Sequence, residues 1–96
     1  MQTIFKTKDK TKRIIYLTKE GWKHILQEHP YLFQYLEKIK ETINKPLQVK
    51  QSTYDESVQY FYKWLKERKK YLLVAVKYLN GTGFVITSFY MRNLKK

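Results

Sequence analysis

The chain has 96 residues, of which 43% are hydrophobic and 17% aromatic, and it contains no cysteine. This length provides for a single hydrophobic core, and the lack of cysteine excludes disulfide bonds and thiolate metal ligands. No apolar run approaches the about 20 residues that a membrane-spanning helix needs, and the first twelve residues lack the apolar centre of a secretory signal. The sequence therefore predicts a cytoplasmic protein that does not act at a membrane.

The charge is strongly unbalanced, with 20 Lys and Arg residues against 8 Asp and Glu residues and a formal net charge of +12 at pH 7. A small domain with this charge attracts polyanions such as nucleic acid, because binding releases counterions. Only Arg13, Arg68 and Arg92 are arginines, however, and arginine grips phosphate better than lysine does. The charge thus favours a nucleic-acid partner, and a solvated lysine-rich surface is the alternative.

The N-terminal part of the chain predicts a basic arm and then a helix. Residues 1–12 are polar and basic, and we expect an arm or a frayed edge strand there, followed by one domain over residues 13–96. A β-type run, Arg13–Leu17, leads to Thr18, which can cap a helix over about residues 19–29. Side chains spaced for one helix face follow, namely Trp22, Ile25, Leu26 and His29. Pro30 favours an end of this helix at His29.

The remainder predicts a second helix and an antiparallel sheet. Apolar residues at helical spacing indicate a helix from Tyr31 or Leu32 to Ile43, and Pro46 follows its end. Four strands are then expected, at Leu47–Ser52, Val58–Trp64, Tyr71–Tyr78 and Phe84–Tyr90. Asn80-Gly81 favours a tight hairpin between the last two. The expected fold class is α+β, with two N-terminal helices packed on a roughly four-stranded antiparallel sheet.

Strand alternation separates the two faces of the predicted sheet. On the central strand, one side carries the apolar set that makes the better core face: Leu72, Val74, Val76 and Tyr78. Lys77 lies on the other side, where a charged group in an apolar strand must reach solvent, a carboxylate or a bound phosphate. The register of the last strand stays open, because a shift of one residue exchanges its faces. Tyrosines such as Tyr60 and Tyr62 either pack at the core edge or stack nucleic-acid bases.

Both histidines fall on the first predicted helix. Five residues separate His24 from His29, so their side chains lie about 140° apart around the axis and do not share a face. Imidazole can transfer a proton near neutral pH, which makes both candidates for catalysis. The alternatives are an ordinary exposed residue at His24 and a packed helix end at His29. This spacing does not suit two ligands of one metal ion, and the sequence offers no third ligand or Gly-rich phosphate loop, so we expect no metal and no cofactor.

Histidine, lysine, arginine and hydroxyl side chains are the groups that cleave RNA without a metal ion. A base removes the proton of the 2′-OH, the oxygen attacks the adjacent phosphorus, and an acid protonates the leaving 5′-oxygen. Cationic side chains stabilise the charge that develops on the phosphate. DNA lacks the 2′-OH and cannot be cleaved in this way.

Several short motifs carry a resemblance to a known family. They are the helix motif Trp22-Lys23-His24-Ile25 with His29-Pro30 after three further residues, the strand Val74-Ala75-Val76-Lys77-Tyr78, and the ending Phe84-Val85-Ile86-Thr87-Ser88-Phe89-Tyr90. From about Arg13 onward the chain resembles the phage and mobile-element branch of the barnase–EndoU–colicin E5/D–RelE-like (BECR) ribonuclease superfamily. The resemblance implies a helix-then-sheet fold, metal-independent ribonuclease activity and a role as a toxin-like domain. It places the helix histidine at His24 and the second histidine at His29, a strand lysine at Lys77, and a strand hydroxyl at Thr87 or Ser88.

The leading hypothesis is therefore a small, toxin-like endoribonuclease that leaves a 2′,3′-cyclic phosphate on tRNA, mRNA or rRNA. Its expected catalytic residues are His24, His29, Lys77, Thr87, Ser88 and Tyr90. Its expected RNA-binding residues are Lys63, Arg68, Arg92, Tyr60 and Tyr62. An acidic antitoxin or immunity protein is a possible partner, by charge complementarity. Two alternatives remain: a non-catalytic module that binds RNA, DNA or the ribosome, and an interaction protein of a phage or mobile element.

Overall fold

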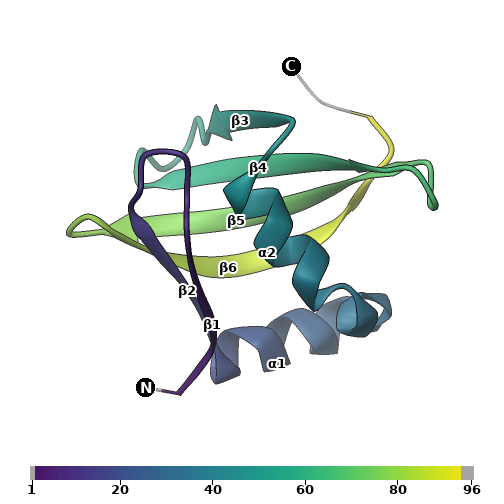
Figure 1. Ribbon diagram of the computed structural model, residues 1–96, viewed down its shortest axis with the longest axis horizontal. Coiled ribbons are helices and arrows are strands. Elements are labelled where there is room, and N and C mark those ends of the chain that lie inside the picture. The colour runs from purple at the N-terminus through teal and green to yellow at the C-terminus, as the bar shows by residue number, and fades with distance from the viewer. Residues whose placement is uncertain (1, 94–96) are drawn as a thin grey trace.

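The structure is a computed structural model that describes residues 2–93. Within these residues the chain forms six strands, two α-helices and one short 3-10 helix (Figure 1). In chain order they are β1 (Thr3–Lys8), β2 (Ile14–Thr18), α1 (Lys19–Glu28), η1 (Pro30–Gln34), α2 (Leu36–Asn44), β3 (Gln48–Gln51), β4 (Val58–Leu65), β5 (Lys70–Leu79) and β6 (Thr82–Met91). The fold is α+β, as the sequence predicts.

The sheet differs from the expected one in size and in topology. All six strands belong to a single sheet in the order β1-β2-β6-β5-β4-β3, and β2 runs parallel to β6 while the other pairs are antiparallel. The prediction of about four antiparallel strands is therefore confirmed only in part: the four expected strands form the antiparallel portion β3–β6, and an additional strand pair, β1–β2, precedes the two helices. Residues 3–8, expected as an arm or edge strand, form the edge strand β1, in which only Phe5 is buried.

Both helices end within one residue of the predicted positions, but only α1 also begins where predicted. Thr18 caps α1 as expected, since its Oγ1 accepts the Gly21 N–H at 3.0 Å. The second helix, expected from Tyr31 or Leu32, begins at Leu36 instead. Pro30 instead begins η1, a short 3-10 helix that precedes α2.

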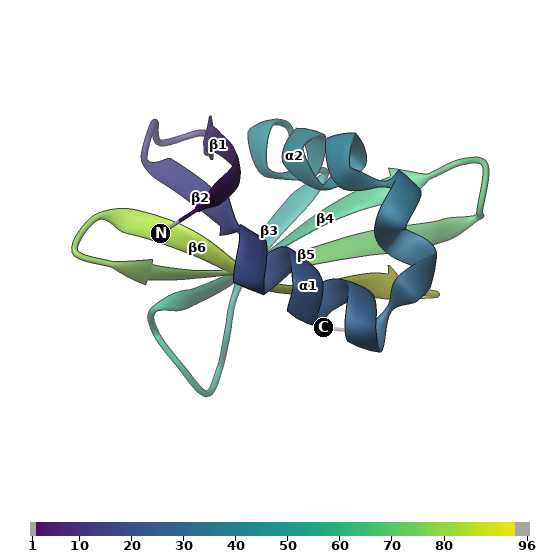
Figure 2. The ribbon, with the colours of Figure 1, turned by 90° about the horizontal axis from the view of Figure 1, so that it is seen from below.

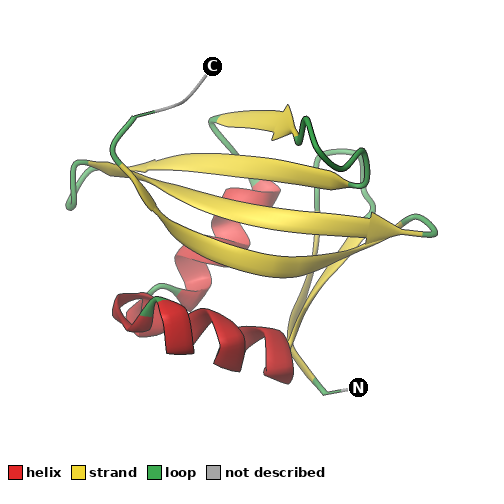
Figure 3. Cartoon of the chain, turned by 180° about the vertical axis from the view of Figure 1, so that it is seen from behind, coloured by secondary structure: helices red, strands yellow, loops and turns green. Residues whose placement is uncertain are grey.

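The two helices occupy different places on the sheet. Figures 1 and 2 show that α2 lies across one face, whereas α1 runs beside the outer edge of β6. Seen from behind in Figure 3, β4, β5 and β6 lie in front of α2, so neither helix covers this second face. We call it the open face.

The buried core lies between the helices and the predicted core face of β5. Its sheet side includes Leu72, Val74 and Val76, as expected, and its helix side includes Ile25 and Ile39. On the open face a smaller cluster forms around the buried residues Tyr62, Leu73 and Ala75, with Tyr60, Phe89 and Met91 packed against it. The aromatic residues of this face thus differ in exposure: Tyr62 is 4% exposed, whereas other aromatic rings remain accessible to solvent.

Two glycines shape the β5–β6 hairpin and the joint to β2. Asn80 and Gly81 have φ values of 55° and 82°, the left-handed conformations that a two-residue hairpin turn requires. At Gly83, a Cβ atom would stand only 2.5 Å from Ile15 Cδ1 and 2.8 Å from Val76 Cγ1. Glycine therefore lets β2 approach β6 closely where these parallel strands pair.

A buried carboxylate fastens the β1–β2 hairpin to the sheet. Asp9 has a side chain only 3% exposed, and it accepts hydrogen bonds from Thr11 Oγ1 at 2.7 Å and Tyr78 Oη at 2.8 Å. It also accepts the Arg13 N–H at 3.0 Å and pairs with Arg13 Nε at 3.2 Å. Burial acts to raise the pKa of Asp9, but these hydrogen bonds outweigh it and hold the pKa below its ordinary value.

Replacing this carboxylate is expected to destabilise the fold. Asp9→Asn loses several charge-assisted hydrogen bonds, and we expect the free energy of unfolding at pH 7 to fall by about 2 kcal/mol in urea titrations. Because the folded-state pKa of Asp9 is depressed, its contribution is present at neutral pH and disappears as the pH falls through that pKa. The exposed Glu56→Ala is the control. Equal stability of Asp9→Asn and the wild type would contradict this role.

Candidate functional site

The outer edge of β6 changes partner halfway along the strand. β2 pairs with β6 only through Ile15–Gly83 and Tyr16–Phe84, and beyond these residues α1 lies beside the edge (Figure 1). His29 is the C-cap of α1, and its N–H donates to Ile25 O at 2.7 Å. This position brings the imidazole to the sheet, with its ring centroid 5.6 Å from that of Phe89 on the open face.

Tyr31 links this imidazole to the edge of the strand. Its Oη lies 3.2 Å from His29 Nδ1, and it accepts the backbone N–H of Tyr90 at 3.3 Å. The rings of Tyr31 and Tyr90 also pack together, with centroids 4.5 Å apart. The Tyr31 hydroxyl thus accepts the Tyr90 N–H at a strand edge where no neighbouring strand can accept it. The same hydroxyl orients the His29 ring.

Tyr90 connects this group to two cationic side chains. Its ring centroid lies 6.0 Å from that of Tyr35 and 5.5 Å from Lys70 Nζ. Arg68, on the β4–β5 turn, donates from Nε to Tyr35 Oη at 2.7 Å. His29, Tyr31, Tyr35, Arg68, Lys70 and Tyr90 form what we call the histidine–tyrosine cluster.

The two inner phenols of the cluster differ in acidity. The hydrogen bond from Arg68 lowers the pKa of Tyr35, whereas burial, together with the adjacent Tyr35 hydroxyl, raises the pKa of Tyr90 to about 12. Tyr90 Oη is buried and has no hydrogen-bond partner among the described residues. Tyr90 thus stays protonated at neutral pH, and Tyr35 lies beside a cation.

The cluster combines groups suited to a phosphate ester. An imidazole can move a proton, Arg68 and Lys70 bring positive charge, and phenols can donate hydrogen bonds to oxygen atoms. Of the residues expected from the sequence, His29, Arg68 and Tyr90 come together here. The sequence patterns did not single out Tyr31, Tyr35 or Lys70, although the placement of two tyrosines soon after the His29-Pro30 pair was a usable signal.

His24 lies apart from this cluster. Its side chain is 55% exposed, and its Nε2 stands 3.7 Å from Glu28 Oε1 on the next turn of α1. The structure therefore places the two histidines in different surroundings, as their angular separation predicts.

Lys77 lies toward the opposite end of β5. It is on the open face, as predicted, and its Nζ contacts Asp55 Oδ2 at 2.8 Å. It lies five positions along β5 from Leu72, the partner of Tyr90, which corresponds to about 16 Å. Hydrogen bonds from Lys77 and Ser57 hold the pKa of Asp55 well below its usual range, so this lysine faces a carboxylate at neutral pH.

Thr87 and Ser88 lie on opposite faces of β6, as consecutive strand residues do, and a bulge before them determines which face each one takes. The register shifts between the pairs Ala75–Thr87 and Val76–Val85, and this shift decides which side chains face the helices. Ser88 faces the core, is fully buried and donates to Leu73 O at 2.7 Å. Thr87 lies opposite Ala75 on the open face and is partly exposed.

The expected RNA-binding residues are also divided between the two faces. Tyr60 and Tyr62 lie on the open face, where Lys50 Nζ stands 6.0 Å from the Tyr62 ring. Lys63 lies on the helix side, and its Nζ contacts Glu41 on α2 at 3.5 Å. Arg92 is exposed directly after β6.

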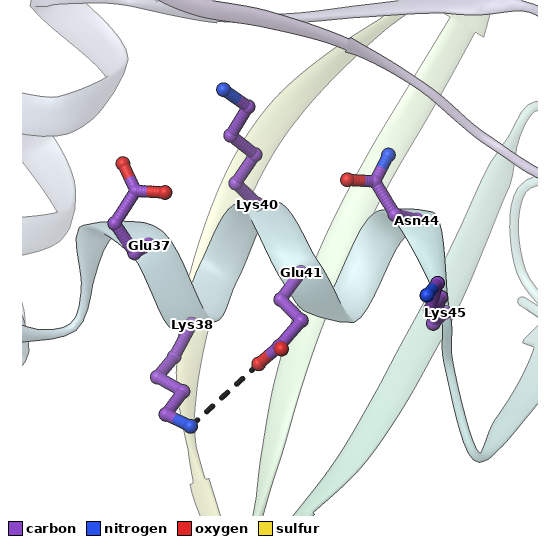
Figure 4. Close-up of a pocket in the computed structure, with 6 residues that line it drawn as sticks. All are labelled: Glu37, Lys38, Lys40, Glu41, Asn44 and Lys45. Atoms are coloured by element: carbon purple, nitrogen blue, oxygen red, sulfur yellow. Dashed lines mark ion pairs between the residues drawn. The ribbon is translucent and has the colours of Figure 1, made fainter.

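The outer surface of α2 carries a shallow pocket of about 430 Å³. Figure 4 shows its lining side chains along α2, with Lys38 Nζ 3.6 Å from Glu41 Oε1. Both charge signs alternate over this surface, and neither of the two histidines lines it, so we place the candidate site at the histidine–tyrosine cluster.

The described residues and the comparisons with known proteins give no further indication of function. Within residues 2–93, no group of three or more His, Asp or Glu side chains is arranged to hold a metal ion. In the same range, no helix is both long and apolar enough to cross a membrane. No protein-family model matches the chain, and neither a curated protein nor a solved structure matches it. The resemblance to the BECR superfamily therefore stays a prediction from short motifs.

The link between Tyr31 and His29 can be tested by nitrogen NMR of the two imidazoles. We expect the neutral form of His29 to hold one predominant tautomer, because Tyr31 Oη fixes the role of Nδ1, while the exposed His24 samples both. Tyr31→Phe should make the His29 pattern resemble that of His24. His24→Gln assigns the signals. An unchanged His29 pattern in Tyr31→Phe would show that the hydroxyl does not orient this ring.

Proposed function

We propose that this chain is an endoribonuclease that cleaves RNA through its 2′-OH, without a metal ion, at the histidine–tyrosine cluster. The observation that carries the proposal is the 3.2 Å contact between His29 Nδ1 and Tyr31 Oη, set beside the cationic groups around Tyr90. A fixed imidazole next to positive charge is the combination that this reaction needs.

In this proposal His29 removes the proton of the 2′-OH. Tyr31 Oη has two lone pairs, so it can accept both the Tyr90 N–H and a proton-bearing Nδ1 of His29. Nε2 is then the basic nitrogen. The 2′-oxygen attacks phosphorus, the bond to the 5′-oxygen breaks, and the products are a 2′,3′-cyclic phosphate and a 5′-hydroxyl.

The remaining cluster residues stabilise negative charge or donate a proton to the leaving group. Arg68 and Lys70 stabilise the negative charge on the phosphate oxygens. Tyr31 is 42% exposed and keeps its own phenol proton in this arrangement, which makes it the candidate acid for the leaving 5′-oxygen. Tyr90, with its pKa of about 12, remains a hydrogen-bond donor throughout the neutral range.

Some residues predicted from the sequence to be catalytic have a smaller role in this mechanism. His24, Lys77 and Ser88 lie away from the cluster or are engaged in other contacts, so we assign the proton transfer to His29 and not to His24. The cellular role that fits this activity is that of a cytoplasmic, toxin-like domain whose acidic partner would be an antitoxin or immunity protein.

A pair of matched variants tests the assignment. We expect His29→Ala to lower the rate of RNA cleavage by at least about 100-fold, the usual contribution of a proton-transfer group, and His24→Ala to cleave at nearly the wild-type rate. The assay incubates purified protein with total RNA and with ribosomes in EDTA and identifies the new ends.

The same assay separates the alternatives. Cleavage by His29→Ala at the wild-type rate would overturn the mechanism. Intact RNA combined with tight, salt-sensitive binding would identify a non-catalytic nucleic-acid-binding module instead.

A further inference from the structure

The open face carries a pair of aromatic rings, one exposed and one partly buried, at the end of the sheet nearest the histidine–tyrosine cluster. Trp64 on β4 pairs directly with Tyr71 on β5, and their ring centroids lie 4.9 Å apart at 64°. Trp64 is 44% exposed, which leaves much of a large apolar ring in contact with solvent. Its neighbour on the same face, Tyr62, is by contrast only 4% exposed.

From Trp64 the open face leads across the strands to His29. Tyr71 pairs with Met91 on β6, and Phe89 lies two residues before Met91 on the same face. The Phe89 ring is in turn 5.6 Å from the His29 ring. Since neighbouring strands are about 4.8 Å apart, only about 10 Å separates β4 from β6 along this path.

Cationic residues lie close in sequence to both ends of this aromatic path. The turn between Trp64 and Tyr71 contains four cationic residues and one acidic residue, namely Lys66, Arg68, Lys69, Lys70 and Glu67. Arg92 follows Met91 at the other side of the path and is exposed. A second copy of this chain, itself carrying a net charge of +12, would be repelled from such a surface, whereas a polyanion is attracted.

We propose, on the basis of the function proposed above, that the substrate is single-stranded RNA and that Trp64 and Tyr71 stack a base of a nucleotide next to the cleaved bond. Exposed aromatic rings beside cations are the means by which proteins hold unpaired bases and their phosphates. In a duplex the bases are stacked on one another and cannot reach these rings. The open face therefore selects unpaired RNA, and the adjacent phosphate reaches His29.

Binding of an RNA that cannot be cleaved tests this proposal without relying on activity. Fluorescence anisotropy would compare a labelled 2′-O-methyl oligouridine with a 2′-O-methyl duplex. We expect Trp64→Ala to weaken single-strand binding about tenfold and to leave duplex binding unchanged, and Trp64→Phe to retain most of the affinity because a ring remains. Tyr54→Ala is the matched control, since Tyr54 is 97% exposed but lies before β4, on the β3–β4 connection.

Each outcome has one meaning, provided that circular dichroism shows a folded variant. Wild-type affinity of Trp64→Ala for the single strand, or an equal loss for the duplex, would overturn the stacking role. A single-strand loss in Trp64→Ala without any RNA cleavage by the wild type would uphold the binding surface and overturn the proposed activity. Cleavage that Trp64→Ala leaves unchanged would do the reverse.

Discussion

The close approach of β2 to β6 at Gly83 determines the geometry of the rest of the molecule. The two strands pair over only two residue positions, because Thr18 ends β2 and caps α1. The second half of β6 is then left with a free edge, a feature that proteins cover or block. Here α1 runs along this edge (Figure 1). Its C-cap His29 and Tyr31 of the following 3-10 helix contact β6 at Phe89 and Tyr90. The candidate site is thus a consequence of how one sheet edge is closed.

The charges divide between the two ends of β5. At the Tyr78 end, Arg13 pairs with the buried Asp9, and Lys77 pairs with Asp55, so positive and negative groups meet and hold the hairpins in place. At the Lys70 end, the cations contact aromatic side chains: Arg68 donates to the Tyr35 hydroxyl, and Lys70 lies over the Tyr90 ring. The ion pairs of the first end stabilise the fold, and the second end places positive charge beside the candidate site.

Local patterns in the sequence predicted the parts of the fold that depend on local physics. Alternation along β5 identified its core face and placed Lys77 opposite it, and Asn80-Gly81 identified the hairpin turn. Long-range features could not be read in this way. The parallel pairing at Gly83 joins segments far apart in the chain, and the bulge near Ala75 decides that Ser88 is buried while Thr87 is not. For the site, helix spacing separated the histidines correctly, but no local pattern revealed that Tyr31, Tyr35 and Arg68 would meet at Tyr90.

The proposed function requires that the imidazole at the closed edge of β6 meets the phosphate of a bound RNA. This contact can be observed in an NMR titration with an oligonucleotide that carries a 2′-deoxy nucleotide at the scissile position, following the imidazole nitrogens and the Arg68 Nε signal. We expect the His29 and Arg68 signals to shift together on binding while the His24 signals stay in place. Shifts at His24 with none at His29 and Arg68 would contradict the assignment of the site.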